Sequence, residues 1–217
     1  MKKLVVIISI LLSASLFAGA QKIINESVDV DGQKVKMEFD FADNITIEAW
    51  KKNAVELEVS VNIDDNNYND YYNLEIKKSS GFIKFEEEVD FEGIKKAMGV
   101  KNLCNFNTDL IYTLKVPEDL EFDLNTISGE IELIGCKGEM DINTVSGFID
   151  YSIPQSHKAM IDLSTVTGDV YSNVKFDNTK LPEAISWVGT NRQLSLNGGN
   201  TGVELKTVSG DIYLREK

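Results

Sequence analysis

The chain has 217 residues, of which 35 are acidic and 22 are lysine or arginine, so its formal net charge is −13 at pH 7. This charge disfavours binding to nucleic acids, anionic lipid surfaces and polyuronides, because phosphate and carboxylate groups need neutralising lysine or arginine. Cationic peptides, divalent cations and neutral glycans stay compatible with it. Part of the charge also keeps an exposed β protein in solution.

The first 20 residues predict a secretory signal peptide. Two lysines follow Met1, an apolar run extends from Leu4 to Phe17, and small residues precede a cleavage site between Ala20 and Gln21. The alternative is an uncleaved anchor helix, but the run is short for a membrane span. Cleavage removes two lysines and leaves 20 basic against 35 acidic residues, a net charge of −15. We therefore expect an exported protein in the periplasm, on the cell surface or outside the cell, with no membrane span in the mature chain.

Residues 21–111 predict strands of uneven length. Polar and apolar residues alternate in 35–41 and 55–61, and 44–47 is a shorter candidate strand. The strand candidates 74–76 and 82–85 flank residues 77–81, which predict a hairpin turn. Only Phe91–Met98 has the composition of a short helix.

The segment 64–73 is rich in aspartate, asparagine and tyrosine. It lacks the glycine at position six and the glutamate at position twelve of an EF-hand loop, which excludes that calcium motif. Tyr68, Tyr71 and Tyr72, with the neighbouring amides, are residue types that stack on and hydrogen-bond a glycan or a peptide. We predict a ligand-binding loop here, with an ordinary polar loop between strands as the alternative.

Four copies of a Thr-[Ile/Val]-[Ser/Thr]-Gly motif mark the C-terminal half. They occupy residues 124–131, 142–149, 163–170 and 205–212, and their glycines lie 18, 21 and 42 residues apart. A period near 20 residues is typical of a solenoid turn. Inside each motif the alternation of apolar residues shifts by one position, which predicts a backbone bend at the glycine.

We therefore predict an all-β protein, a single-domain β-solenoid of the parallel β-helix type. Residues 21–111 form its less regular part, and residues 112–217 carry the regular repeats. Successive copies are expected to stack as successive rungs, with threonine and serine hydroxyls in rows and isoleucine, leucine and valine inside. The residue after each motif glycine is Glu130, Phe148, Asp169 or Asp211. The three acids are either solvated outward positions or a weak Ca²⁺-binding face; we name no other metal ligand and no cofactor.

The two cysteines, Cys104 and Cys136, have two possible states. In an exported protein they can form a disulfide that stabilises the fold by roughly 3–4 kcal/mol on the chain-entropy model. The alternative is two separate buried thiols.

The residues needed for common catalytic mechanisms are missing. His157 is the single histidine, it follows Pro154-Gln155-Ser156, and we expect it in an exposed turn. With one histidine and no Gly-x-Ser-x-Gly sequence, neither a serine-hydrolase triad nor a histidine zinc site is expected. Trp50 and Trp187 are expected to pack at the surface or at the ends of the coil. We predict no catalytic residues and no enzyme.

The repeats, together with the preceding Tyr112–Pro117, resemble the bacterial putative-adhesin family of β-solenoid domains of unknown function. Leu196-Asn197-Gly198-Gly199 followed by Thr207–Ile212 is similar to the end of those domains. The resemblance covers about residues 35–217 and is specific from Tyr112 onward. It implies a β-helix-like fold and an envelope or surface location, and it brings no catalytic or binding residues.

These observations favour an exported, non-enzymatic envelope protein, an adhesin or binding scaffold for an unknown surface ligand such as a glycan or a peptide. A polysaccharide-cleaving β-helix enzyme is one alternative. An envelope-stress sensor that binds cationic peptides through its acidic surface is another.

Overall fold

The computed structural model describes residues 21–104, 106–177, 187–189 and 191–217. The predicted signal peptide, residues 1–20, lies outside the described residues. None of the described helices combines the length and the hydrophobicity that a membrane span requires. The described elements in chain order are β1 (Lys22–Asp29), β2 (Lys34–Glu38), β3 (Asn44–Trp50), β4 (Ala54–Ile63), η1 (Asn69–Tyr71), β5 (Tyr72–Lys78), β6 (Phe82–Val89), α1 (Phe91–Met98), β7 (Thr108–Pro117), β8 (Phe122–Thr126), β9 (Glu130–Ile134), β10 (Met140–Ser146), β11 (Ile149–Ile153), β12 (Ala159–Thr165), β13 (Asp169–Ser172), β14 (Trp187–Val188), β15 (Asn191–Leu196), β16 (Thr201–Ser209) and β17 (Ile212–Glu216).

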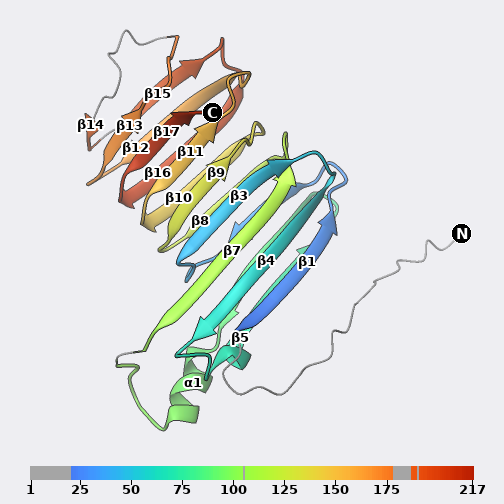
Figure 1. Ribbon diagram of the computed structural model, residues 1–217, viewed down its shortest axis with the longest axis vertical. Helices are drawn as coiled ribbons and strands as arrows, with labels where there is room; N and C mark the ends of the chain where they lie inside the picture. Colours follow the sequence, from blue (N-terminus) through green and yellow to red (C-terminus); the bar gives the residue numbers. More distant parts are fainter. Residues whose placement is uncertain (1–20, 105, 178–186, 190) are drawn as a thin grey trace, which may run out of the picture.

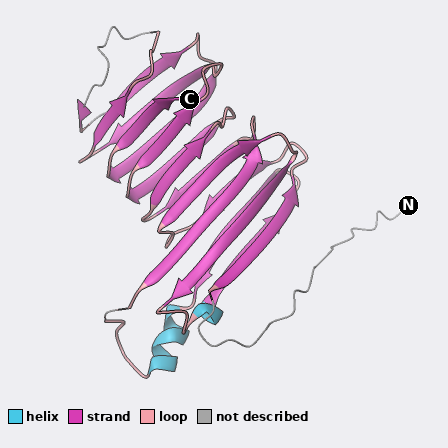
Figure 2. Cartoon of the chain, in the orientation of Figure 1, coloured by secondary structure: helices cyan, strands magenta, loops and turns pink. Residues whose placement is uncertain are grey.

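The strands form two sheets (Figures 1 and 2). The first has the order β1-β4-β7-β3-β9-β11-β17-β13-β14, and the second has the order β15-β12-β16-β10-β8-β2-β6-β5. Both sheets run through the irregular and the regular part of the chain, because β3 pairs with β9 and β2 pairs with β8. The all-β prediction is confirmed. The helix α1 lies at the end of the longer strands.

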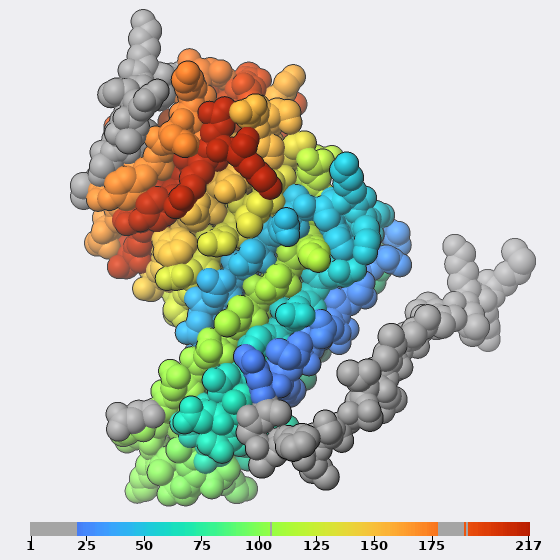
Figure 3. Space-filling view, viewed as in Figure 1, coloured from blue at the N-terminus to red at the C-terminus, as the bar shows by residue number. Residues whose placement is uncertain are grey.

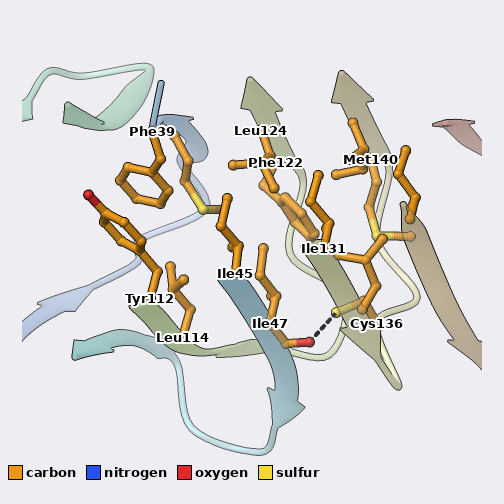
Figure 4. Close-up of a cluster of buried hydrophobic side chains, with 14 of the residues drawn as sticks. Phe39, Ile45, Ile47, Tyr112, Leu114, Phe122, Leu124, Ile131, Cys136 and Met140 are labelled. Carbon is orange, nitrogen blue, oxygen red and sulfur yellow. Dashed lines mark hydrogen bonds between the residues drawn. The ribbon is translucent and has the colours of Figure 1, made fainter. Parts of the chain in front are cut away.

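The core lies between the two sheets. Buried and half-buried residues alternate along most strands, so each strand contributes one apolar face. Figure 4 shows Ile45 and Ile47 from one sheet and Phe122 and Leu124 from the other, all within this layer. Aromatic rings also pack in this core, where Tyr112 stacks on Phe39 with 4.3 Å between ring centroids.

The local predictions for the hairpin and the helix are confirmed. The antiparallel strands β5 and β6 are joined by a turn at residues 79–81. The helix α1 has the predicted bounds, because Asp90 caps its start by accepting a hydrogen bond from the Gly93 N–H at 2.7 Å. Gly99, in the left-handed conformation, ends it.

The four repeats stack in register, but not in chain order. Their threonines form one buried row, with Thr126 beside Thr144, Thr144 beside Thr207 and Thr207 beside Thr165. The fourth copy therefore lies between the second and the third, so the prediction of successive rungs is wrong. Each copy has threonine and glycine at equivalent positions, so it can pair in the same register with any other copy. The long interval before the fourth copy lets β16 and β17 insert between strands that precede them in the chain.

The predicted bend at the motif glycine is confirmed, and its cause is close backbone contact. A Cβ on Gly147 would lie 2.1 Å from the Gly129 carbonyl oxygen, and one on Gly210 would lie 1.9 Å from the Gly147 oxygen. The aliphatic residue two positions before each glycine follows a buried threonine and continues the alternation outward, so Val145 is 50% exposed and Val166 is 63% exposed. The prediction that these aliphatic residues fill the interior is therefore wrong for the motif positions. The flanking apolar residues do so instead.

The cysteines are unpaired. Cys136 is buried, with its sulfur 4.0 Å from the Ile47 carbonyl oxygen, whereas Cys104 is exposed before β7. The disulfide alternative therefore fails, and of the two thiols in the other alternative only Cys136 is buried.

His157 is buried, contrary to the prediction of an exposed turn. The turn after β15 covers it, because the Asn197 side-chain amide donates to the His157 carbonyl at 2.7 Å. Its ring lies edge-on to Tyr151, and burial lowers the pKa of the imidazole. Trp50 is half-buried at the end of β3, as predicted, and the side chain of Trp187 lies outside the described part.

Candidate functional site

The tyrosine-rich loop is held by its own side chains. Asn69 is buried and accepts a hydrogen bond from the Ile63 N–H at 2.7 Å. The half-buried rings of Tyr68 and Tyr71 lie 6.1 Å apart, and Tyr68 also lies 6.4 Å from Phe106. These rings pack against the core at the end of the sheets. A ligand role for Tyr68 and Tyr71 stays a prediction.

Tyr72 is not available to a ligand, so its predicted role is wrong. Only 2% of the residue is exposed, and its hydroxyl lies 2.9 Å from the Tyr112 hydroxyl. Tyr112 in turn donates a hydrogen bond to Glu87, which also accepts from the Phe41 N–H. Tyr72 is the first residue of β5, and the inward face of that strand places its ring in the core.

The predicted row of residues after the motif glycines exists on the outer face of the first sheet. The register of β9, β11, β17 and β13 places Glu130, Phe148, Asp211 and Asp169 in line, in that order. Asp211 and Asp169 are direct neighbours, and the Asp169 N–H donates to the Asp211 carboxylate at 2.8 Å. Phe148 separates them from Glu130, as predicted.

The next outward residues on these strands add aromatic rings. Tyr171 and Tyr213 stack with 5.2 Å between centroids and 12° between planes, and Phe148 lies edge-on to Tyr213 at 6.0 Å. Each tyrosine hydroxyl donates to the acid two residues earlier, Tyr171 to Asp169 and Tyr213 to Asp211, both at 3.1 Å. Burial and the bond to Asp211 raise the pKa of Tyr213, so its hydroxyl remains a donor at neutral pH.

An arginine completes this surface. The Arg215 guanidinium lies 2.7 Å from the Asp150 carboxylate and 5.5 Å from the centre of the Tyr213 ring. We call this surface the aromatic–acidic platform and define it as Phe148, Asp150, Asp169, Tyr171, Asp211, Tyr213 and Arg215. It lies on the face of the sheet seen in Figure 3, where β17 is red and β13 is orange.

The platform is acidic. The outward positions of β9, β11, β17 and β13 carry five carboxylates and one arginine, with Glu130 and Glu132 joining the three platform aspartates. One carboxylate oxygen each of Asp150 and Asp169 is buried and has no hydrogen-bond partner in the described part of the chain. These acceptors make the surface suited to a ligand that brings N–H or O–H groups.

The acids do not form the calcium site that was the alternative for Glu130, Asp169 and Asp211. The described residues contain no group of three histidine, cysteine, aspartate or glutamate side chains that could hold a metal ion. The cause is the spacing, because Phe148 lies between Glu130 and the adjacent pair of aspartates. A Ca²⁺ site needs six to eight converging oxygens.

Sequence reasoning found Asp169, Asp211 and Phe148 but missed the two tyrosines. The signal was present as the sequence Gly-Asp-[Val/Ile]-Tyr in the third and fourth copies. Residues two apart on a strand share a face, so Tyr171 and Tyr213 follow from the acids. Arg215 is again two residues beyond Tyr213. What the sequence could not show is that β17 lies between β11 and β13, which brings these residues together.

Comparisons with known proteins bear on the same repeats. The family described as Toastrack DUF4097 matches residues 113–215. This match begins at the point where the sequence resemblance becomes specific, and the matched residues include the whole platform. No curated protein gives a significant match.

One solved structure supports the fold, and others match less well. A putative cell adhesion protein from Clostridium sporogenes has a TM-score of 0.56 and 13% identity, covering 91% of this chain and 100% of that one. A putative lipid binding protein from Parabacteroides distasonis has a TM-score of 0.29 and 12% identity, with 90% and 96% covered. A putative adhesin from Bacteroides fragilis has a TM-score of 0.26 and 11% identity, with 92% and 99% covered. Only the first has a TM-score above 0.5, and at 13% identity this likeness concerns the fold alone.

Proposed function

We propose that this chain is an exported, non-enzymatic binding scaffold that recognises basic peptide segments on the aromatic–acidic platform. The observation that carries the proposal is Arg215. Its guanidinium pairs with Asp150 and lies over the Tyr213 ring, so the platform already binds one cationic side chain of its own. Arginine or lysine of a partner would find the same chemistry beside Tyr171, Asp169 and Asp211.

The charge of the molecule supports this ligand class. Five carboxylates against one arginine on four neighbouring strands create a negative potential on an already acidic chain. A single exposed ion pair contributes only about 0.2–1 kcal/mol, so one basic residue would bind weakly. A segment with several basic residues would contact several strands at once, and its affinity would rise through multivalency.

The platform is held in place before a ligand arrives. Both tyrosine hydroxyls are bonded to aspartates on their own strands, and Asp169 and Asp211 are linked through the backbone. The strands β11, β17 and β13 are paired side by side. Little side-chain freedom is left to lose on binding, which favours recognition on this face.

A binding role agrees with the coarse likeness to a putative cell adhesion protein, although a shared fold alone does not define a ligand. The repeats fit a binding role as well, because a β-solenoid is a stack of rungs that carries side chains on its outer faces. A polysaccharide-cleaving activity is the competing function, and release of reducing ends from neutral or acidic glycans would establish it.

The test is fluorescence anisotropy of labelled nona-arginine with the purified mature chain at 0.1 M NaCl. We expect Asp169→Asn with Asp211→Asn to weaken binding by roughly tenfold, since each of the two lost ion pairs contributes about 0.2–1 kcal/mol. We expect a similar loss from Tyr171→Leu with Tyr213→Leu, since a cation–π contact contributes about 0.5–2 kcal/mol. The control is Asp141→Asn with Asp162→Asn, which removes the same charge from outward positions of β10 and β12 in the other sheet.

The control separates a site from a general charge effect. If the Asp141 and Asp162 variant loses as much affinity as the Asp169 and Asp211 variant, the peptide responds to net charge and the platform is not the site. Equal affinity of the wild type and the tyrosine variant would show that the two tyrosine rings do not contribute to binding. Unfolding curves of each variant show whether the fold is intact.

A further inference from the structure

A groove at the end of the two sheets shares no residue with the platform. It has a volume of about 680 Å³ and lies between three turns, at residues 30–34, 50–53 and 117–121. Val30 and Leu120, both buried, lie in its wall. A second hollow of about 450 Å³ shares Trp50, Lys51 and Glu118 with the first. We call the two together the Trp50 groove. Both volumes fall within the range of small-molecule sites.

Trp50 stands where the two hollows meet, and it is fixed by its neighbours. Its indole N–H donates to the Ala54 carbonyl at 2.8 Å, and the Lys52 ammonium lies 4.4 Å from the ring centre. Lys115 also lies over the ring, 6.0 Å from its centre. Because the N–H is used inside the protein, the ring offers a ligand the apolar surface that the two lysines leave open. The negative face of an aromatic ring attracts positively polarised C–H groups.

The groove also contains a buried acceptor without a partner. Gln33 is 8% exposed and its side-chain N–H donates to the Ser79 carbonyl. Its side-chain oxygen has no hydrogen-bond partner among the described residues. A buried amide oxygen in this state is costly, so a ligand hydroxyl that donates to it is favoured.

The charges of the groove nearly cancel, in contrast to those of the platform. Lys34, Lys51 and Lys52 line the larger hollow together with Glu118, Asp119 and Glu121. Lys34 pairs with Glu121 at 3.2 Å, and Glu118 pairs with Lys137 at 2.5 Å. Neither a strongly anionic nor a strongly cationic ligand is favoured by this balance. The wall offers both hydrogen-bond donors and acceptors beside an aromatic ring.

We propose that the Trp50 groove binds a neutral oligosaccharide. A sugar ring has C–H groups on its faces, which fit against Trp50, and hydroxyls on its edge that both donate and accept hydrogen bonds. The hydroxyls would donate to Gln33 and Asp119 and accept from Lys51. A short chain of sugars would extend from one hollow to the other over the indole ring, which explains why Trp50 lines both.

The experiment uses the mature chain carrying Trp187→Phe, which leaves Trp50 as the single tryptophan. Chitotetraose, cellotetraose and maltotetraose are titrated while tryptophan fluorescence is recorded, with tetragalacturonate as the anionic comparison. We expect saturable binding of at least one neutral tetrasaccharide and at least tenfold weaker binding of tetragalacturonate. Calorimetry with Trp50→Leu in the otherwise native chain should show at least a tenfold loss of affinity.

A matched control is available in Phe82→Leu. Phe82, like Trp50, is an aromatic residue with a lysine over its ring, Lys36 at 5.3 Å, but it lies outside the groove. The proposal is overturned if none of the three neutral sugars binds, if tetragalacturonate binds more tightly, or if Trp50→Leu and Phe82→Leu have equal effects. The platform variants leave the groove intact. A negative result for nona-arginine binding therefore concerns only the platform, and a negative result for sugar binding concerns only the Trp50 groove.

Discussion

At the scale of single residues, the least expected feature is the buried chain of hydroxyls that ends at Glu87. Tyr72 and Tyr112 lie 2.9 Å apart at their hydroxyls, and Tyr112 donates to the Glu87 carboxylate. Burial raises the pKa of Glu87 to about 7, although the bonds from Tyr112 and the Phe41 N–H favour its charged form. The carboxylates of Asp40 and Asp43 add to the rise.

This carboxyl makes stability depend on pH. Between about pH 4.5 and pH 7 the folded chain holds a proton on Glu87 that the unfolded chain has released, so stability falls as pH rises. The resulting loss of folding stability reaches roughly 3 kcal/mol above pH 7. We expect Glu87→Gln to remove it, so that the variant gains about this much stability relative to the wild type between pH 4.5 and pH 8. Urea unfolding at the two pH values measures it.

Glu88→Gln is the control for this prediction, because Glu88 is an exposed acid on the same strand. It should follow the wild type at both pH values. Parallel stability curves for the wild type and Glu87→Gln would show that Glu87 titrates as an ordinary glutamate and that the hydroxyl chain does not hold its proton.

Single residues were also where the sequence was least informative. Tyr72, His157 and Cys136 are of types that occur both inside and outside proteins, and all three are buried. Their burial depends on elements distant in the chain, such as the turn after β15 that covers His157. Alternation within one strand predicts which residues share a face, but it does not show what covers a turn.

At the scale of elements, the motif glycines determine how closely the rungs approach. Their backbones touch in the spatial order Gly129, Gly147, Gly210 and Gly168, and a Cβ on Gly168 would lie 1.7 Å from the Gly210 oxygen. Thr165 and Thr207 stabilise the same bend, since their hydroxyls donate to the carbonyls of Gly210 and Gly147 respectively. Backbone atoms on both sides leave no direction in which a side chain could be accommodated.

We therefore expect Gly210→Ala to destabilise the fold by roughly 3 kcal/mol or more, because a Cβ 1.9 Å from the Gly147 oxygen forces two strands apart. Gly202→Ala, near the start of β16, should change stability by about 1 kcal/mol or less, since its Cβ would meet only the Glu139 side chain at 3.7 Å. Denaturant unfolding of both variants measures the difference. Similar stabilities would mean that the rungs can separate without cost.

Elements were the level at which the sequence was most informative. The period of the repeats, the hairpin and the helix α1 follow from local patterns, and the bend at each glycine follows from the shift in alternation. The order of the rungs does not. All four copies present threonine and glycine at equivalent positions, so their sequences fit next to one another in any order. The position of β16 between β10 and β12 is decided by packing over the whole fold.

At the scale of the whole molecule, charge separates the two proposed sites. The platform gathers its three carboxylates from β11, β13 and the start of β17, whereas the Trp50 groove balances its lysines against acids. This distribution follows from strand order and turn position, so the net charge of −13 gives no indication of it. Ligands that bind through these two surfaces should therefore respond differently to salt.

We expect nona-arginine binding to weaken by at least tenfold between 0.1 M and 1 M NaCl, since the screening length falls from about 10 Å to about 3 Å. Binding of a neutral tetrasaccharide should change by less than about twofold over the same range, because contact with Trp50 and hydrogen bonds to Gln33 involve no net charge. Anisotropy and calorimetry at four salt concentrations measure the two slopes. A peptide affinity that is independent of salt would mean that apolar contacts rather than the aspartates hold the peptide, and it would refute the electrostatic role assigned to Asp169 and Asp211.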